Sequence, residues 1–141
     1  MADPAVPAAP DSETVDVVII GGGPVGSALA LALQPTGLRV VLLEARTAAT
    51  GDARPLALSY GTRLILERLG VWPVLAAHAT PIRHIHVSQQ GAFGRVGLEA
   101  SEAGLPELGY VIEYRLLAQE LARAAQPAAA DCRIGARVDL S

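Results

Sequence analysis

Three glycines in the segment GGGPVG have the spacing of a turn that binds a diphosphate. Gly21 would allow a tight turn, Gly23 would let a phosphate approach the backbone without meeting a Cβ atom, and Gly26 would let a helix pack close to a strand. The amide N–H groups and the positive dipole at the start of that helix would favour a negatively charged group. The segment therefore predicts a binding site for the diphosphate of a dinucleotide.

One carboxylate is placed to complete such a site. Glu44 lies 18 residues beyond Gly26, at the end of the next apolar run. A carboxylate at that point accepts hydrogen bonds from ribose hydroxyls, and its charge repels a 2′-phosphate, which disfavours NADP. The spacing does not distinguish FAD from NAD, and the alternative is a glycine-rich turn that binds nothing.

The residues around the turn predict a βαβ unit that would position it. Val17–Ile20 is a run of β-branched residues, which indicates a buried strand of a parallel sheet. Pro24 suits the first position of a helix, which we expect to continue through Ser27–Leu33 and to stop at the proline and glycine that follow. A second β-rich run at Leu38–Leu43 completes the unit.

The remainder of the chain alternates between expected helices, strands and polar turns. Apolar spacings of three and four residues indicate the helices, and β-branched runs beside glycine indicate the strands. We expect a loop at 46–55, a helix at 56–69, a helical turn at 71–77, a hairpin with strands at 82–89 and 96–98, a loop at 100–109, a helix at 116–125 and a last strand at 132–140. Residues 1–14 lack periodicity and predict a disordered tail.

The composition excludes several classes of protein. The chain has 141 residues, 51% of them hydrophobic, and a net charge of −3, which fits one folded domain and excludes a disordered chain or a basic nucleic-acid-binding domain. Its one cysteine, Cys132, excludes an intrachain disulfide and a cysteine-based zinc site, and it predicts a small core residue in a cytoplasmic protein. No apolar run approaches the roughly 20 residues of a membrane-spanning helix. We expect Trp72 and Tyr60 to pack beneath a helix pair, with stacking on a cofactor as the alternative.

Two other groups of polar residues are interpreted as structural. His84 and His86 alternate along an expected strand and would share one face. No third ligand is evident nearby, so we predict a solvent-facing or interdomain strand surface and no metal site. The acidic residues of the following loop, which we interpret as solvated rather than as an acid/base pair, are Glu99, Glu102 and Glu107.

Two long segments resemble a known family. The opening of the flavoprotein aromatic hydroxylases is similar to DVVIIGGGPVGSALALALQPTGLRVVLLEAR, which starts at Asp16. A pattern typical of the ubiquinone-biosynthesis hydroxylases, D-x-R-x-x-A-L-S followed by a helix ending in L-G-x-W, resembles DARPLALSYGTRLILERLGVW, which starts at Asp52. Further similarity to this group lies at residues 85–88, 91, 94 and 108–113, so the resemblance extends over nearly all of the chain after Asp16.

The resemblance implies that the bound dinucleotide is FAD. The residues that it implies as cofactor-binding are Gly21, Gly23, Pro24, Val25, Gly26, Glu44, Ala45, Arg46, Arg54 and Arg115. An arginine in the loop before the second helix can form charge-assisted hydrogen bonds to a pyrophosphate or a ribitol group, which is the role implied for Arg54. For both Arg54 and Arg115 the alternative is an ordinary surface charge.

The resemblance also implies an FAD-dependent monooxygenase. In such enzymes NAD(P)H is the transient reductant, O2 is the co-substrate, and the protein orients an electron-rich phenol in a dry pocket. A polyprenylated methoxyphenol is the implied substrate, and it implies work at the inner-membrane surface or with other proteins of ubiquinone biosynthesis. No catalytic residue is assigned. The alternatives are another FAD-dependent oxidoreductase and a non-catalytic nucleotide-binding fragment.

The extent of the resemblance bears on domain organisation. No G-D-A-x-H segment, which in the family supports the flavin, occurs in these 141 residues. From the resemblance we expect that most of the substrate-domain sheet is missing as well. We therefore expect residues 15–141 to be the N-terminal part of a Rossmann-like α/β FAD-binding domain with a parallel sheet. A hairpin excursion at about 82–98 would be part of the substrate region. We expect this chain alone to be inactive, to expose an open sheet edge and to hold FAD weakly.

Overall fold

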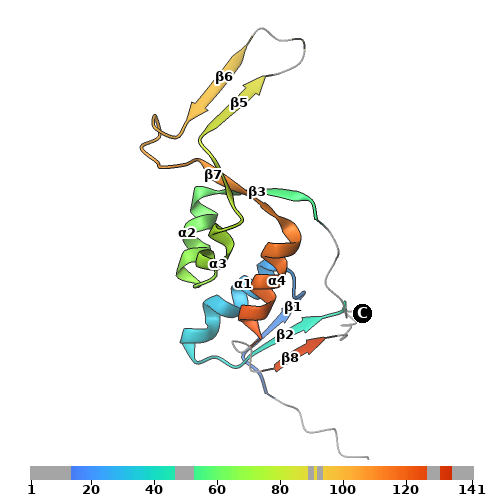
Figure 1. Ribbon diagram of the computed structural model, residues 1–141. Coiled ribbons are helices and arrows are strands. Elements are labelled where there is room, and N and C mark those ends of the chain that lie inside the picture. Colours follow the sequence, from blue (N-terminus) through green and yellow to red (C-terminus); the bar gives the residue numbers. More distant parts are fainter. Residues whose placement is uncertain (1–13, 47–52, 89–90, 92–93, 127–130, 135–141) are drawn as a thin grey trace, which may run out of the picture.

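The computed structural model describes residues 14–46, 53–88, 91, 94–126 and 131–134 (Figure 1). Over these ranges the chain forms a parallel sheet with two helices on it, an antiparallel sheet with further helices, and a hairpin that projects away from both (Figure 1). The predicted tail falls almost wholly outside the described residues.

The parallel sheet contains the predicted βαβ unit. Its strands are β1 (Val17–Ile20), β2 (Val40–Glu44) and β8 (Asp131–Ile134), in the order β1-β2-β8. Helix α1 (Pro24–Leu33) connects the first two strands and begins at the predicted proline. A 3₁₀ turn, η1 (Gln34–Thr36), extends α1 through Pro35, and Gly37 then ends it with a φ of +75°. The predicted end of the α-helix at Leu33, before the proline and glycine, is therefore confirmed, and the short 3₁₀ turn was not predicted.

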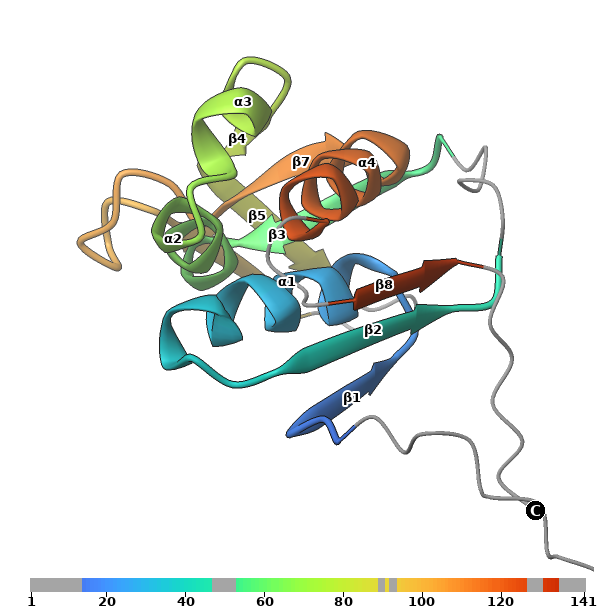
Figure 2. The ribbon, with the colours of Figure 1, turned by 90° about the horizontal axis from the view of Figure 1, so that it is seen from below.

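Only one face of the parallel sheet is covered within the described residues. Helix α1 packs against this face, and α4 (Tyr114–Ala125) packs on α1 on the same side of the sheet, as Figure 2 shows. The buried side chains between the layers are Ile19, Ala30, Val40, Leu42 and Ala125. Val18 and Ile20 point to the opposite face and are 49% and 60% exposed. The expectation of a fully buried first strand is therefore wrong for the described residues, because both helices lie on the same side.

The antiparallel sheet corrects the predicted helix at 56–69. Its strands are β3 (Pro55–Ser59), β7 (Gly109–Glu113) and β4 (Thr80–Ile82), in the order β3-β7-β4. Leu56 and Leu58 belong to β3, and helix α2 (Tyr60–Arg68) begins only after Ser59, whose Oγ accepts a hydrogen bond from the Thr62 amide at 3.1 Å. The helical spacing was real from Tyr60 onward, but β7 provides β3 with a strand partner that lies about fifty residues further along the chain. Strand β7 itself was not predicted.

Helix α4 contributes to two hydrophobic cores, one at each sheet. Helix α3 (Trp72–Ala76) confirms the predicted helical turn, and it packs with α2 against the antiparallel sheet. Helix α4 contributes Leu117 and Leu121 to this core and Ala125 to the core of the parallel sheet. The other buried members of the larger core are Leu58, Leu66, Val71, Trp72, Leu75 and Ile112. Burial of each large apolar side chain contributes about 1.5–3 kcal/mol to folding.

The predicted hairpin is confirmed, with different bounds. Strands β5 (His84–Ser88) and β6 (Arg95–Glu99) pair antiparallel, with His84 opposite Glu99 and Ser88 opposite Arg95. Ile82 was expected in this hairpin but belongs to β4 and pairs with Gly109 of β7. Between these two strands the structure describes Gly91, whose φ is +81°, and Gly94. The last predicted strand begins as β8, and residues 135–141 lie outside the described residues.

Candidate dinucleotide-binding site

The candidate site lies at the edge of the parallel sheet where the strands end. Helix α1 leads from β1 to β2, and α4 leads into β8, which is parallel to β2. Each helix must return the chain to the start of the next parallel strand, so both helices begin at the carboxyl edge of the sheet (Figure 2). Open α/β sheets bind their ligands at this edge. The arrangement places the glycine turn, the end of β2 and the start of α4 on one side of the molecule.

The glycine turn has the backbone geometry of a phosphate-binding turn. Gly21 has a φ of +104°, which favours glycine, and its amide donates to the Leu43 carbonyl at 2.8 Å. A Cβ atom on Gly26 would overlap the carbonyl oxygen of Gly21, so the helix can lie this close to the turn only with glycine there. Gly23 has no heavy atom within 4 Å of the position that a Cβ would take. Gly21 thus bends the chain, Gly26 allows the helix to pack closely against the turn, and Gly23 leaves room for a ligand.

The start of α1 is suited to an anion. Gly23 is the N-cap residue and provides no side-chain cap, and Pro24 occupies the first helical position. The amide of Ser27 donates to the Gly23 carbonyl at 2.9 Å, which is the first hydrogen bond of the helix. The amides of Val25 and Gly26 come before it in the first turn and have no acceptor within the helix. Val25 is 84% exposed, so the entrance to this turn is not covered within the described residues. A diphosphate fits these donors and the helix dipole.

Glu44 is held at the end of β2 by hydrogen bonds to its carboxylate. Oε2 accepts a bond from the Gly22 amide at 2.9 Å, and Oε1 accepts bonds from the Arg46 amide at 2.8 Å and the Arg46 Nε at 3.2 Å. The bond from the Arg46 amide is the largest cause that lowers the pKa of Glu44 below its ordinary 4.5, although partial burial opposes the shift. The carboxylate is therefore ionised at neutral pH and directly linked to the glycine turn. A carboxylate has further acceptor positions, which ribose hydroxyls can use.

Arg54 and Arg115 both lie at the start of α4. The Arg54 Cζ lies 4.8 Å from the centre of the Tyr114 ring, and the Arg54 carbonyl accepts a hydrogen bond from the Tyr114 amide at 3.0 Å. The Nε of Arg115 lies 2.9 Å from Oε1 of Glu113. The structure therefore brings both arginines to the same edge as the glycine turn and Glu44. Ala45 and Arg46 follow Glu44 directly and are exposed.

Two residues of this edge were missed by the sequence analysis. Gly22 donates its amide to Glu44, and Tyr114 contacts Arg54. Gly22 occupies the x position of the G-x-G segment and has no side chain. Nothing in the sequence therefore indicates that its amide bonds to Glu44. Tyr114 lies between two charged residues at the start of a helix, and its contact with Arg54 spans sixty residues of sequence.

The aromatic residues expected beneath the helices form core contacts. Trp72 is buried and meets Tyr110 edge to face, with ring centres 4.7 Å apart. Arg63 lies over the rings of both Tyr60 and Trp72, with its Cζ 5.7 Å from each centre. These contacts confirm the packing interpretation for Trp72, and they lie on the antiparallel sheet rather than at the carboxyl edge.

The acidic loop is more ordered than we predicted. Glu107 accepts a hydrogen bond from the Tyr110 hydroxyl at 2.9 Å and lies 3.7 Å from Arg83. The pKa of Tyr110 is raised above its ordinary 10.0. Burial is the largest cause of this shift, and the hydrogen bond to Glu107 is the next largest. Glu99 contacts the Nδ1 of His84 across the hairpin, and only Glu102 is simply exposed. The interpretation of all three carboxylates as solvated was therefore wrong for Glu107, whereas Glu99 stays about half exposed while it contacts His84.

The hairpin histidines occupy the strand surface that we predicted. His84 and His86 are both exposed. Among the residues that the structure describes, no three His, Cys, Asp or Glu side chains come close enough together to hold a metal ion. The side chain of Cys132 lies outside the description.

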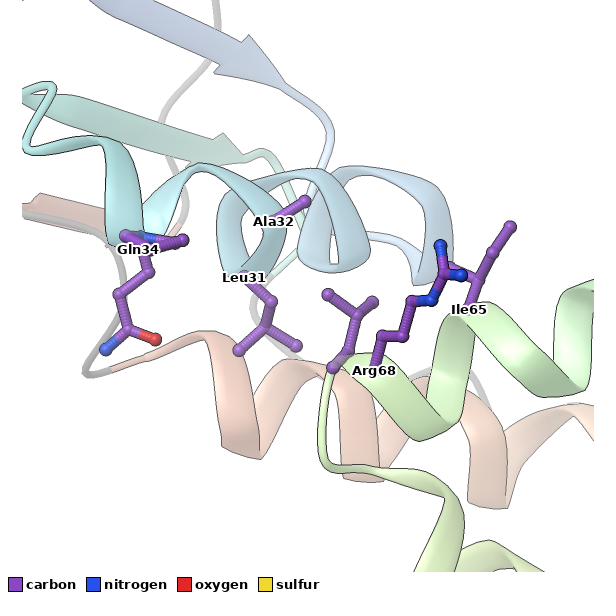
Figure 3. Close-up of a pocket in the computed structure, with 7 residues that line it drawn as sticks. Leu31, Ala32, Gln34, Ile65 and Arg68 are labelled. Atoms are coloured by element: carbon purple, nitrogen blue, oxygen red, sulfur yellow. The ribbon is translucent and has the colours of Figure 1, made fainter.

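A groove of about 560 Å³ lies at the far end of α1, away from the candidate site (Figure 3). It runs between the ends of α1 and α2. The residues that line it are Leu31, Ala32, Gln34, Pro35, Ile65, Arg68 and Leu69. Because α1 begins at the carboxyl edge of the sheet and ends here, this groove is not part of the dinucleotide site.

Comparison with known proteins identifies the family. A family model described as an FAD binding domain matches residues 14–140. The chain belongs to this FAD-binding domain family. Ubiquinone hydroxylase UbiL of Rhodospirillum rubrum is 36% identical over 114 residues, which cover 77% of this chain and 26% of the relative. The 3-demethoxyubiquinol 3-hydroxylase of Escherichia coli is 34% identical over 117 residues, which cover 78% of this chain and 30% of the relative. The resemblance to ubiquinone-biosynthesis hydroxylases is thus confirmed.

A solved structure confirms the FAD-binding fold. The flavin-dependent monooxygenase PieE, solved in complex with FAD and substrate, matches with a TM-score of 0.70 and 29% sequence identity. The match covers 90% of this chain and 24% of PieE. The chain likewise spans about a quarter to a third of the two curated relatives, 26% and 30% of their lengths. No helix in the described part of this FAD-binding domain is long and apolar enough to cross a membrane.

Proposed function

We propose that this chain binds FAD as part of an FAD-dependent aromatic hydroxylase. The observation that carries the proposal is the turn at Gly21–Gly26, where a Cβ-intolerant Gly26 lets an uncapped helix start lie beside an open Gly23. A turn that served only to connect β1 and α1 would not need both features. The ionised carboxylate of Glu44, bonded to the middle of this turn, supports the same proposal.

Each part of the edge has a role in holding the cofactor. The amides of the glycine turn would bind the pyrophosphate, and Glu44 would accept hydrogen bonds from the adenosine ribose. Arg54 would donate charge-assisted bonds to the pyrophosphate or ribitol, and Arg115 would add positive charge at the start of α4. When bound, FAD supplies the redox chemistry that NAD(P)H and O2 require, while the protein orients the reactants and excludes water.

The proposed substrate is a polyprenylated phenol. Two curated relatives are named as a ubiquinone hydroxylase and a demethoxyubiquinol hydroxylase, and the residues at 85–88 and 108–113 resemble 2-octaprenyl-6-methoxyphenol hydroxylase. A substrate with a long isoprenoid tail partitions into the bilayer, so the proposal includes peripheral association with the membrane surface. Deletion of the gene in its host tests this assignment. We expect a polyprenyl phenol that lacks one ring hydroxylation to accumulate, and an unchanged quinone pool would contradict the substrate class.

Cofactor binding is tested on the 141-residue chain itself. Titration of the ¹⁵N-labelled chain with ADP, with FAD and with NADP should shift the amide resonances of Gly22, Gly23, Val25 and Gly26. Both ADP and FAD should move these resonances, and NADP should bind more weakly because its 2′-phosphate meets the charge of Glu44. Shifts confined to other residues, or no shifts with FAD at millimolar concentration, would contradict the proposal.

A further inference from the structure

We propose that Tyr114 is a positioning residue that holds the Arg54 guanidinium at the cofactor edge. This inference rests on the proposed function, in which Arg54 binds the pyrophosphate or ribitol of FAD. Tyr114 would act through Arg54 and would not itself need to touch the cofactor. Three observations carry the proposal: a ring contact, a backbone hydrogen bond and the strand register beside them.

The ring contact restricts the arginine side chain. The Arg54 Cζ lies 4.8 Å from the centre of the Tyr114 ring, within the roughly 6 Å range of a cation–π interaction. Arg54 is exposed, and an exposed arginine has many rotamers, whose entropy a bound anion would have to overcome. A cation–π contact is an attraction between the charge and the ring electrons, and it does not need a conventional N–H···O hydrogen bond. A ring beneath Arg54 can therefore orient the group without using the donors that a phosphate needs.

The backbone fixes where this contact occurs. The Tyr114 amide donates to the Arg54 carbonyl at 3.0 Å, and the next residue, Pro55, pairs with Glu113 at the end of β7. The Tyr114 amide belongs to the first turn of α4, whose amides have no acceptor within the helix. One bond thus satisfies the start of α4 and anchors the chain at the entry to β3. Both partners of the ring contact are held at neighbouring backbone positions.

The start of α4 also gives the arginine its location. Helix α4 begins at the carboxyl edge of the parallel sheet, on the side of the glycine turn and Glu44. Tyr114 is the first residue of this helix and is partly buried. Its ring therefore provides a platform that belongs to the packed part of the fold. Arg54, in contrast, lies in the connection between β2 and β3, directly before the first residue of β3.

The test compares FAD affinity among substitutions of this pair. Tyr114→Leu removes the ring, Tyr114→Phe keeps it, and Arg54→Ala removes the cation. We expect FAD to bind about tenfold more weakly to Arg54→Ala and about three- to fivefold more weakly to Tyr114→Leu, with Tyr114→Phe within a factor of two of the wild type. The double variant Arg54→Ala/Tyr114→Leu should bind FAD no more weakly than Arg54→Ala, because Tyr114 acts through Arg54. Tyr60→Leu is the matched control, since its ring lies over a different arginine, Arg63.

A second readout uses the chain without FAD. The ring of Tyr114 should shift the Arg54 δ-proton resonances upfield, and this shift should be lost in Tyr114→Leu and kept in Tyr114→Phe. Thermal unfolding of each variant separates a loss of folding from a loss of positioning, and rescue by phenylalanine supports the ring contact.

The outcomes separate the two proposals. If the wild-type chain does not respond to FAD at millimolar concentration, or if Arg54→Ala binds FAD as well as the wild type does, the proposed cofactor role fails and this inference fails with it. If Arg54→Ala weakens binding but Tyr114→Leu does not, or if the two losses multiply in the double variant, only the positioning role of Tyr114 is contradicted. Equal losses in Tyr114→Leu and Tyr114→Phe would also contradict it.

Discussion

The two sheets of the molecule each depend on a glycine that lies against a backbone carbonyl, but for different purposes. In the parallel sheet, a Cβ on Gly26 would overlap the Gly21 carbonyl oxygen, and this close approach shapes the candidate binding turn. In the antiparallel sheet, a Cβ on Gly109 would overlap the Leu58 carbonyl oxygen, where β7 pairs with β3. One glycine forms a site and the other only permits two strands to pair. The comparison shows that a required glycine is not by itself a sign of function. The combination of open space beside Gly23 with an uncapped helix start is what points to a ligand.

The largest expected effect is on the antiparallel sheet. Gly109→Ala should lower the free energy of unfolding by about 3 kcal/mol, because the added methyl must push β7 away from the Leu58 carbonyl. Denaturant unfolding measures the loss. Gly97→Ala in the hairpin is the control, since its methyl would meet only His84 Cε1 at 3.7 Å, and it should change stability by less than about 1 kcal/mol. Equal stabilities for the two variants would show that β7 can accept the added methyl, and would contradict the close contact between Gly109 and the Leu58 carbonyl.

Gly26→Ala should combine a stability loss with a loss of ligand response. We expect the free energy of unfolding to fall by about 2 kcal/mol, since α1 must move away from the turn to accept the methyl. The same displacement should abolish the response of the turn amides to ADP. The comparison between the sheets fails if Gly26→Ala unfolds like the wild type and still binds ADP.

A smaller effect is expected where the antiparallel sheet meets the acidic loop. Tyr110→Phe removes the hydroxyl that donates to Glu107 and should cost about 1 kcal/mol of stability. The raised pKa of Tyr110 means that the folded state favours the neutral phenol, so its contribution should be lost as the pH rises beyond about 10. Chemical unfolding at pH 7 and above pH 10 measures both effects. Glu107→Gln keeps an acceptor oxygen and should cost less than Tyr110→Phe; the reverse order would indicate that the hydrogen bond is not what Glu107 contributes.

The smallest effect is expected at Glu44 in acid. The pKa of Glu44 is lowered in the folded state, so its contribution to stability is fully present above about pH 4.5 and is lost as the pH falls through the lowered value. Glu44→Gln should therefore flatten the fall in unfolding free energy on the acid side without moving the alkaline side. An unchanged acid slope would mean that the bonds from Gly22 and Arg46 do not favour the ionised form.

The contrast between the sheets also explains what could be predicted from the sequence. The parallel βαβ unit is encoded locally: Val17–Ile20, the glycine turn and Glu44 lie within thirty residues, and their spacing predicted their positions. The strand at Pro55–Ser59 was assigned to the start of α2 because its partner β7 lies about fifty residues away. The two-residue spacing of Leu56 and Leu58 is a strand signal, but it is too short to mark a strand by itself. The same distance in sequence concealed Tyr114 beside Arg54.

Polar contacts in the loops were also beyond the sequence. Glu107 and Glu99 occur in a segment rich in acidic and small residues, which is typical of a solvated loop. Their partners, Tyr110 and His84, are brought to them by the turn after β6 and by the hairpin register. The site residues themselves remain predictions about ligand binding, although the structure places them at one edge.

One substitution tests the central claim, that the turn at Gly21–Gly26 binds a diphosphate. Gly23→Ala adds a methyl into open space at a backbone conformation that alanine adopts readily, with a φ of −68° and a ψ of −177°. Stability should therefore stay within about 0.5 kcal/mol of the wild type. The methyl should nevertheless block the approach of a phosphate, so we expect ADP and FAD affinities, measured by titration of the turn amides, to fall at least about tenfold. Undiminished affinity of a fully folded Gly23→Ala chain would contradict the claim.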